Sequence, residues 1–264
     1  MQIDLAGTKA IVTGSTTGIG HAIALQLARS GAEVVLNGRD AARTDEAVVR
    51  LKAALPQARA RGVAADVSTA QGCATLVEAA PDADILINNA GVFGMKDFFA
   101  TTDDEWRDFF EVNVMSGVRL SRACLAGMLK RGWGRVVFIS SESALNVPPD
   151  SLPYGATKTA QLAVSRGLAE LTRGTAVTVN AVIPGPTLSD NAEAFLGDVA
   201  RQQGKSLEEV AAAFIRERWP ASLLQRFATV EEVANLVLYL CSREASATNG
   251  AALKADGGVV RTIL

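Results

Sequence analysis

A tyrosine and a lysine in the stretch VVFISSESALNVPPDSLPYGATK, residues 136–158, have types and spacing that suit proton transfer. Tyr154 and Lys158 are four residues apart, so on a helix they lie on one face, one turn from each other. A phenol with a pKa of about 10 is a poor acid–base catalyst near neutral pH, and a neighbouring ammonium is expected to lower that pKa. Ser141 comes thirteen residues before Tyr154 and is expected to donate a hydrogen bond to the same reacting oxygen.

A strand and a helix must position these side chains. Val136–Ile139 is a β-branched and aromatic run that predicts a buried strand, and Ser141 follows its end. A proline-rich loop then leads to a predicted helix that begins near Tyr154 and continues to Thr172. We therefore expect the serine at the end of a strand, and the tyrosine and lysine on the first turns of a helix.

A second motif lies near the N-terminus. Lys9–Thr13 predicts a short buried strand, Gly14–Gly20 (GSTTGIG) a glycine-rich turn, and His21–Ser30 a helix with one apolar face. This order is typical of a dinucleotide-binding unit, in which the glycines let the backbone approach a pyrophosphate and the helix N-terminus offers N–H groups to it. The spacing here is GxxxGxG, which differs from the GxGxxG of many such sites.

These motifs resemble the short-chain dehydrogenase/reductase family, in which a serine lies thirteen residues before Tyr-x-x-x-Lys and the first turn reads Thr-Gly-x-x-x-Gly-x-Gly. The resemblance covers the whole chain, because three further segments also match family motifs: Asn88–Gly91, Pro184–Thr187 and Asp256–Gly258. The chain is similar to single-domain members of the family such as 3-oxoacyl carrier-protein reductases. It implies an α/β fold, a Rossmann-type doubly wound parallel sheet of about seven strands with helices on both faces. Residues 1–264 are expected to form a single dinucleotide-binding and catalytic domain, with a substrate lid at about 188–227.

The resemblance also implies roles for individual residues, and no metal ligand. Asn113, Ser141, Tyr154 and Lys158 would be catalytic, and Asn113 would distort a helix predicted over 101–130 and hold a water that links Lys158 to solvent. Phe93, Ser143 and Phe195 are candidate substrate contacts. Cofactor contacts are implied for Gly14, Ser15, Thr17, Gly18, Ile19, Gly20, Arg39, Asp66, Val67, Asn89, Ala90, Gly91, Tyr154, Lys158, Pro184, Gly185 and Thr187.

Two of these implied cofactor contacts have specific partners in the family. Asp66 and Val67 would contact the adenine, although Asp66 also suits the cap of a helix predicted over 69–80. Thr187, after the Pro-Gly turn beside the nicotinamide, would bind the carboxamide.

The end of the second predicted strand, Glu33–Asn37, bears on the choice between NADP(H) and NAD(H). An NAD-preferring site usually carries an acidic residue here, which binds the ribose hydroxyls. This chain instead has Asn37-Gly38-Arg39-Asp40, and Arg39 suits a bidentate contact with a 2′-phosphate, to which the Ser15 hydroxyl would add. We therefore expect NADP(H) to be favoured over NAD(H). The alternative is that Arg39 is a solvated loop cation and that Asp40 caps the next helix.

These features predict a reversible, metal-independent hydride transfer between a nicotinamide and a carbonyl or secondary alcohol, with 3-oxoacyl thioesters among the candidate substrates. Lys130, Arg131 and Arg173 would suit an acidic carrier protein, or are ordinary solvated cations. Two alternatives stay open: an NAD-dependent alcohol or sugar dehydrogenase of the same family, and a catalytically silent nucleotide-binding module. Epimerases and dehydratases of the extended type share Tyr-x-x-x-Lys, but they usually have a different glycine spacing and a longer C-terminal domain.

The composition excludes several other classes. The 264 residues are 48% hydrophobic and 20% charged, and a net charge of −2 argues against nucleic acid or an anionic membrane as partner. His21 is the single histidine, which argues against a histidine-ligated zinc site or a Ser–His–Asp triad. Cys73, Cys124 and Cys241 are far apart and predict buried thiols. With no apolar run of spanning length and no secretory signal, we expect a cytoplasmic enzyme of small molecules, assembled as a homotetramer or dimer as the resemblance implies.

Overall fold

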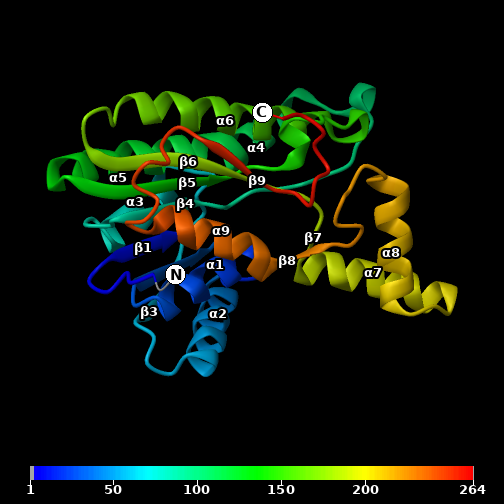
Figure 1. Ribbon diagram of the computed structural model, residues 1–264, viewed down its shortest axis with the longest axis horizontal. Helices are drawn as coiled ribbons and strands as arrows, with labels where there is room; N and C mark the ends of the chain where they lie inside the picture. Colours follow the sequence, from blue (N-terminus) through cyan, green and yellow to red (C-terminus); the bar gives the residue numbers. More distant parts are fainter. Residues whose placement is uncertain (1–2, 264) are drawn as a thin grey trace.

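Seven parallel strands form the centre of the computed structural model, which describes residues 3–263 (Figure 1). Their order across the sheet is β3-β2-β1-β4-β5-β6-β9, and every pairing is parallel. This confirms the predicted doubly wound sheet. The strands are β1 (Lys9–Val12), β2 (Glu33–Gly38), β3 (Ala60–Ala64), β4 (Ile85–Asn88), β5 (Trp133–Ile139), β6 (Ala176–Pro184) and β9 (Ala252–Ala255).

Helices cover both faces of the sheet, as Figure 1 shows, and each face has its own core. Alternation along a strand divides the side chains between the cores: Ala10 and Val12 of β1 face one of them, and Ile11 faces the other. One face carries α1 (Gly18–Arg29), α2 (Ala41–Ala54) and α9 (Val230–Cys241), and the other carries α3 (Ala70–Ala79), α5 (Ser116–Arg131) and α6 (Leu152–Glu170).

No helix within residues 3–263 is long and apolar enough to cross a membrane.

The strand order reverses between β1 and β4, which pair through Val12 and Ile87. In open parallel sheets the crevice outside the carboxyl ends of the strands, at such a reversal, is where ligands bind. The glycine-rich turn after β1 and the Asn88–Gly91 segment after β4 meet there, and β5 delivers Ser141 to the same edge. The topology thus brings the sequence motifs to one side of the molecule.

The stretch predicted as one helix over 101–130 has three parts. The α-helix α4 (Asp103–Phe110) begins at a capping box made by Thr102 and Glu105. A π-helical segment follows at Glu111–Met115 and carries Asn113, and α5 continues from Ser116. The wider π turn inserts one extra residue per turn, so it rotates the side chains that follow it.

The segment between β6 and α9 leaves the regular alternation of strands and helices. It contains α7 (Asp190–Gln203) and α8 (Leu207–Arg218), which lie beside the main body in Figure 1 and enclose a small core around Leu196 and Val210. Two short strands that the sequence did not predict, β7 (Thr187–Leu188) and β8 (Ala228–Thr229), pair with each other at its base. Three 3-10 turns lie around the same edge of the sheet: Phe98–Ala100, Glu142–Ala144 and Pro149–Ser151.

Candidate active site

Ser141, Tyr154 and Lys158 meet at the carboxyl end of β5. Ser141 precedes the Glu142–Ala144 turn and accepts a hydrogen bond from the Ser143 N–H at 3.2 Å. Tyr154 is in the first turn of α6 and is hydrogen-bonded to Ser141. The Lys158 Nζ lies 5.6 Å from the centre of the Tyr154 ring and donates to the carbonyl oxygen of Ile139 at 2.9 Å. The three side chains are therefore arranged for hydrogen bonding and proton transfer at one point.

The pKa values of this group differ from the expectation. Burial raises the pKa of Tyr154 to about 12; its hydrogen bond with Ser141 opposes this rise, and the nearby charge of Glu142 adds to it. Burial lowers the pKa of Lys158 to about 8. The prediction that Lys158 depresses the pKa of Tyr154 is therefore wrong for this structure, because burial dominates this pKa and the hydrogen bond with Ser141 is what opposes the rise.

Asn113 is fully buried and connects three elements. Its side chain accepts from the Val92 N–H at 2.8 Å and donates to the Val92 carbonyl at 3.1 Å and to the Thr157 Oγ1 at 2.9 Å. Its own carbonyl oxygen accepts a hydrogen bond of 2.6 Å from the Gln161 Nε2. These bonds hold the loop after β4 against α6; the implied water link to Lys158 stays a prediction.

Gly91 is the point where the loop after β4 passes the catalytic side chains. A Cβ at this position would lie 3.2 Å from the Asn113 Oδ1 and 3.4 Å from the Lys158 Nζ. A side chain here would press on the Asn113 amide and come into contact with the Lys158 ammonium. The role of Gly91 in this structure is therefore to let the backbone come close to the catalytic residues.

The glycine-rich turn is tightly packed where a cofactor phosphate would lie. A Cβ on Gly20 would come within 2.4 Å of the Gly14 carbonyl oxygen and 2.5 Å of the Asn89 Nδ2. The Asn89 amide in turn donates to the carbonyls of Thr13 and Gly14 at 2.9 and 3.0 Å, so it fixes the turn against β4. Thr17 is exposed and makes no side-chain cap, and the first-turn N–H groups of a helix have no partner within it. This arrangement suits a bound anion.

Ser15 does not have the role predicted for its hydroxyl. The residue is fully buried, and its Oγ donates to the Val12 carbonyl at 2.7 Å and accepts from the Asn37 N–H at 2.9 Å. The predicted contact between this hydroxyl and a 2′-phosphate is therefore wrong for this structure. Arg39 is exposed and engages no hydrogen bond or ion pair among residues 3–263, whereas Asp40 caps α2 by accepting from the Arg43 N–H at 2.8 Å.

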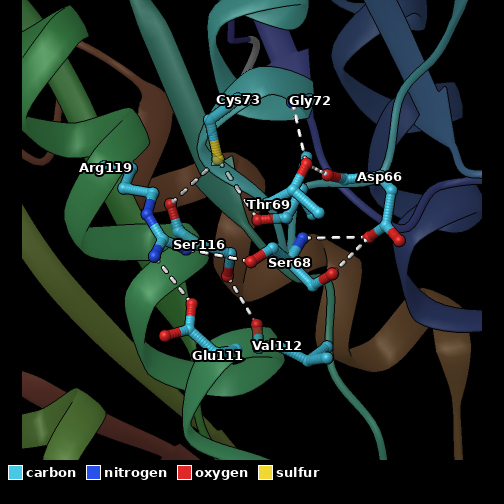
Figure 2. Close-up of polar contacts among 10 residues, drawn as sticks. Asp66, Ser68, Thr69, Gly72, Cys73, Glu111, Val112, Ser116 and Arg119 are labelled. Carbon is cyan, nitrogen blue, oxygen red and sulfur yellow. Dashed lines mark hydrogen bonds and ion pairs between the residues drawn. The ribbon is translucent and has the colours of Figure 1, made fainter. Parts of the chain in front are cut away.

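Figure 2 shows the surroundings of Asp66. Its Oδ1 accepts from the N–H and the hydroxyl of Ser68, at 3.0 and 2.7 Å, while Thr69 caps α3. The Ser68 carbonyl is held by Arg119, which also pairs with Glu111 at 2.7 Å beside the π-helical segment. The helix cap predicted for Asp66 is therefore wrong: Thr69 makes the cap of α3, and the Asp66 side chain instead closes a turn with Ser68. The side chain of Val67 is buried in the core, so a contact of Val67 with adenine would involve its backbone.

The remaining predicted cofactor residues line the path from β4 to β7. The Ala90 N–H donates to the Thr13 Oγ1 at 2.9 Å, and the Thr187 Oγ1 donates to the Gly185 carbonyl at 2.9 Å. Pro184 ends β6. Asp190 was not named from the sequence as a site residue, yet its Oδ2 accepts from the Gly18 N–H at 2.8 Å, in the turn that would hold the phosphates. The only signal available was its position a few residues after the Pro-Gly turn.

The predicted substrate residues fall into two groups. The Phe93 ring stands edge-on to Tyr154, with ring centres 5.0 Å apart, and is 63% exposed; Ser143 is buried next to Ser141. Phe195 lies farther out, in α7, where its ring is 6.2 Å from that of Phe214. The structure thus places Phe93 and Ser143 at the catalytic group and Phe195 in an aromatic cluster outside it.

One contact that no sequence motif indicated joins this cluster to the catalytic serine. The Trp219 Nε1, just after α8, donates to the Glu142 Oε1 at 2.9 Å, and the Glu142 Oε2 accepts from the Ser141 Oγ at 3.1 Å. Trp219 also packs against Phe214, with ring centres 5.8 Å apart. A carboxylate therefore lies directly beside the catalytic serine, under the segment that carries α7 and α8.

Metal ligation has no evident place in this arrangement. Within residues 3–263 there is no group of three or more His, Cys, Asp or Glu side chains that is placed to hold a metal ion. Cys73, Cys124 and Cys241 are all buried, and burial raises the pKa of each thiol. They are inert packing residues rather than ligands or nucleophiles.

Comparison with known proteins extends the similarity over the whole chain. The family profile described as enoyl-(acyl carrier protein) reductase matches residues 14–260. YvaG of Bacillus subtilis, described as an uncharacterized oxidoreductase, is 46% identical over 263 residues, covering 100% of both chains. The 3-oxoacyl-[acyl-carrier-protein] reductase FabG of Aquifex aeolicus is 33% identical over 263 residues, covering 98% of this chain and 100% of the relative.

A solved structure is also similar to this chain over its full length. L-sorbose reductase from Gluconobacter frateurii, complexed with NADPH and L-sorbose, superposes with a TM-score of 0.93 at 32% identity, and the match covers 100% of each chain. The similarity therefore includes the α7–α8 segment as well as the sheet.

Proposed function

This chain belongs to the short-chain dehydrogenase/reductase family, and we propose that it is an NADP(H)-dependent enzyme that reduces a small ketone and oxidises the corresponding secondary alcohol. The observation that carries the proposal is the meeting of Ser141, Tyr154 and Lys158 beside a glycine turn built for a dinucleotide. The fit to the cofactor rests on the crowding around Gly20 and on the guanidinium of Arg39, which is unpaired within residues 3–263.

The three side chains have separate tasks in the reducing direction. When bound, NADPH would be the source of the hydride that the carbonyl carbon receives. Ser141 donates a hydrogen bond to the carbonyl oxygen and so stabilises the negative charge that develops there. Tyr154, which holds its proton at neutral pH because its pKa is raised to about 12, donates that proton to the same oxygen. Lys158, held by the Ile139 carbonyl, stabilises the phenolate that results.

The preference for NADP(H) over NAD(H) is supported by Arg39 and by the NADPH held in the related L-sorbose reductase. Fluorescence titrations of the purified protein with NADPH and with NADH test it. Much tighter binding of NADPH is expected. Equal or tighter binding of NADH would remove Arg39 as the phosphate reader, and binding of neither would refute the enzymatic proposal.

A ketose is the substrate that we favour over a 3-oxoacyl thioester. The match to L-sorbose reductase supports the ketose, whereas the match to FabG supports the 3-oxoacyl thioester. Two of the three cations considered for an acidic carrier are already engaged: Arg131 pairs with Asp84 at 3.3 Å and Arg173 with Glu170 at 3.0 Å. Fewer free cations are therefore left to bind an acidic carrier protein.

We further propose that the enzyme assembles as a homotetramer in the cytoplasm. Exposed aromatic side chains support association: Phe99 is 93% exposed, Phe98 lies beside it, and Phe110 at the end of α4 is also exposed. The three buried, unpaired thiols fit a reducing compartment. Light scattering after gel filtration tests the assembly, and a monomeric mass would contradict it.

Substitution of Tyr154 by Phe tests the catalytic assignment. The ring packing against Phe93 is kept and only the hydroxyl is lost. We expect kcat to fall by a factor of about 100 or more while the affinity for NADPH stays within about twofold. Turnover retained at the level of the unsubstituted enzyme would refute the assignment.

A further inference from the structure

Glu142 is a buried carboxylate in direct contact with the catalytic serine. It is 7% exposed, and both of its oxygens accept hydrogen bonds, from the Ser141 Oγ at 3.1 Å and from the Trp219 Nε1 at 2.9 Å. An ionised carboxylate has about four lone-pair sites, so about two of them are left for another donor. The chemistry of hydride transfer described above assigns no task to this group.

No cation compensates this charge at the site. Glu142 forms no ion pair among residues 3–263, and the Lys158 ammonium is turned to the Ile139 carbonyl. Arg218, next to Trp219 in the chain, is paired with Asp150 at 2.7 Å. The charge of Glu142 nevertheless acts at the reacting group, because it contributes to the raised pKa of Tyr154. A buried charge that has hydrogen bonds but no counter-ion is costly, which favours a functional reason for it.

The position of Glu142 relative to the substrate follows from its bond to Ser141. A carbonyl oxygen that accepts from the Ser141 Oγ at normal hydrogen-bond distance lies roughly 5–6 Å or less from the Glu142 carboxylate. A substrate carboxylate one or two carbons from the carbonyl would therefore face a like charge in a site of low polarity, where repulsion is strong. A hydroxyl in the same position would instead donate to one of the free lone pairs.

Resting on the function proposed above, we propose that Glu142 makes the site selective for uncharged, hydroxyl-bearing ketones and against oxo acids. It would bind a hydroxyl next to the reacting carbonyl, and the Ser141 proton would turn from Glu142 to the carbonyl oxygen when the substrate enters. The competing role is structural: Glu142 would only anchor the α7–α8 segment through Trp219. The two roles differ in whether the charge of Glu142 affects the choice of substrate.

Two matched pairs of ketones separate these roles. Acetoacetate and ethyl acetoacetate share the reacting carbonyl and differ in charge; hydroxyacetone and butanone differ in a hydroxyl next to the carbonyl. The reduction of each by NADPH is measured for the enzyme and for Glu142→Gln, which removes the charge and keeps the shape. The amide oxygen can still accept from the Trp219 Nε1, and the amide NH2 then donates to the Ser141 Oγ. Trp219→Phe keeps the charge and removes the bond to the lid. Glu244→Gln, at an exposed position after α9, controls for the same change elsewhere.

We expect the unsubstituted enzyme to prefer the ester over acetoacetate and hydroxyacetone over butanone, each by at least about tenfold in kcat/KM. In Glu142→Gln both preferences should shrink by about tenfold, and in Trp219→Phe and Glu244→Gln both ratios should stay unchanged. Equal ratios in the enzyme and Glu142→Gln would overturn the inference and leave the proposed function intact. Ratios that also collapse in Trp219→Phe would assign the effect to the lid contact instead. An enzyme that reduces none of the four ketones would count against the proposed function itself.

Discussion

At the scale of single residues, the surroundings of Tyr154 set its pKa and thereby the pH at which each direction of the reaction runs: burial raises this pKa most, and the charge of Glu142 adds to the rise. Its raised pKa keeps the phenol protonated at neutral pH, which suits proton donation to a carbonyl. In the oxidising direction the same group must first lose its proton to act as a base. Glu142 opposes this loss, because a nearby negative charge disfavours the phenolate.

Substitution of Glu142 by Gln is expected to change the pH profile of alcohol oxidation. Removing the negative charge stabilises the phenolate, so the pKa of Tyr154 falls. Activity that requires the phenolate appears as the pH rises through this pKa, and the rising limb of kcat against pH should therefore move to lower pH. Glu244→Gln is the control, for which no movement is expected. An unchanged midpoint in Glu142→Gln would show that its charge does not reach Tyr154.

Arg39 offers a second test at this scale. We expect Arg39→Ser to raise the Kd for NADPH by about 10- to 100-fold, because hydrogen bonds to a charged partner contribute about 1.5–3 kcal/mol, and to leave the Kd for NADH within about twofold. Parallel fluorescence titrations measure both. Lys52→Ser removes an exposed cation from the last turn of α2 and should change neither constant. Equal weakening of the two cofactors would rule out a contact specific to the 2′-phosphate.

At the scale of elements, a glycine in α1 is required by packing, whereas a glycine in α6 is not. Gly20 in α1 sits where a Cβ would meet the Gly14 carbonyl, so the glycine permits close packing of the turn. Gly167 in α6 is exposed and has no atom within 4 Å of a built Cβ, so its missing side chain serves no packing purpose. The first position is fixed by the cofactor turn, and the second only costs helix stability.

The same substitution at the two glycines should therefore have opposite effects. Gly20→Ala is expected to lower the free energy of unfolding by about 1–3 kcal/mol and to weaken NADPH binding at least about tenfold, because the Gly14 carbonyl must move. Gly167→Ala is expected to raise stability by about 0.5–1 kcal/mol and to leave NADPH binding unchanged. Urea unfolding and fluorescence titration measure the two quantities. A neutral Gly20→Ala would mean that the turn is not rigid.

The π-helical segment Glu111–Met115 links two helices through Asn113. Asn113 is held from both sides, by the Val92 backbone and by Gln161, which bonds its carbonyl at 2.6 Å. This side-chain bond ties the helix of Asn113 to the helix of Tyr154.

At the scale of the whole molecule, the α7–α8 segment is attached at its base and at its end. Pairing of β7 with β8 closes the base, and Asp190 reaches the cofactor turn at Gly18. At the far end Trp219 bonds Glu142, and Arg218 pairs with Asp150 on the loop before Tyr154. The segment therefore contacts both the cofactor side and the substrate side of the site, as a lid would.

Substitution of Trp219 by Phe tests this attachment. The aromatic packing against Phe214 is kept, and only the hydrogen bond to Glu142 is lost. We expect KM for the ketone to rise about tenfold or more, since a bond to a charged group is removed, with the Kd for NADPH unchanged. Trp106→Phe, in α4, should leave KM unaltered. A KM unchanged in Trp219→Phe would mean that the segment does not need this contact to cover the substrate.

The sequence by itself determined the fold class, the boundaries of most elements and the candidate catalytic residues. Buried strands and amphipathic helices leave local periodic patterns, and the glycine turn and Tyr-x-x-x-Lys are contiguous motifs whose geometry depends on neighbours in the chain. That is why Tyr154 and Lys158 were found on one helix and Ser141 at the end of a strand.

Only the tertiary structure decided what surrounds these residues. Glu142 and Trp219 are 77 residues apart and Gly18 and Asp190 are 172 apart, so no local pattern connects them. The inward turn of the Ser15 hydroxyl and the raised pKa of Tyr154 depend on burial, which packing sets and residue type does not. Fold and reaction class follow from short-range patterns, whereas the environment that selects a substrate follows from contacts between distant parts of the chain.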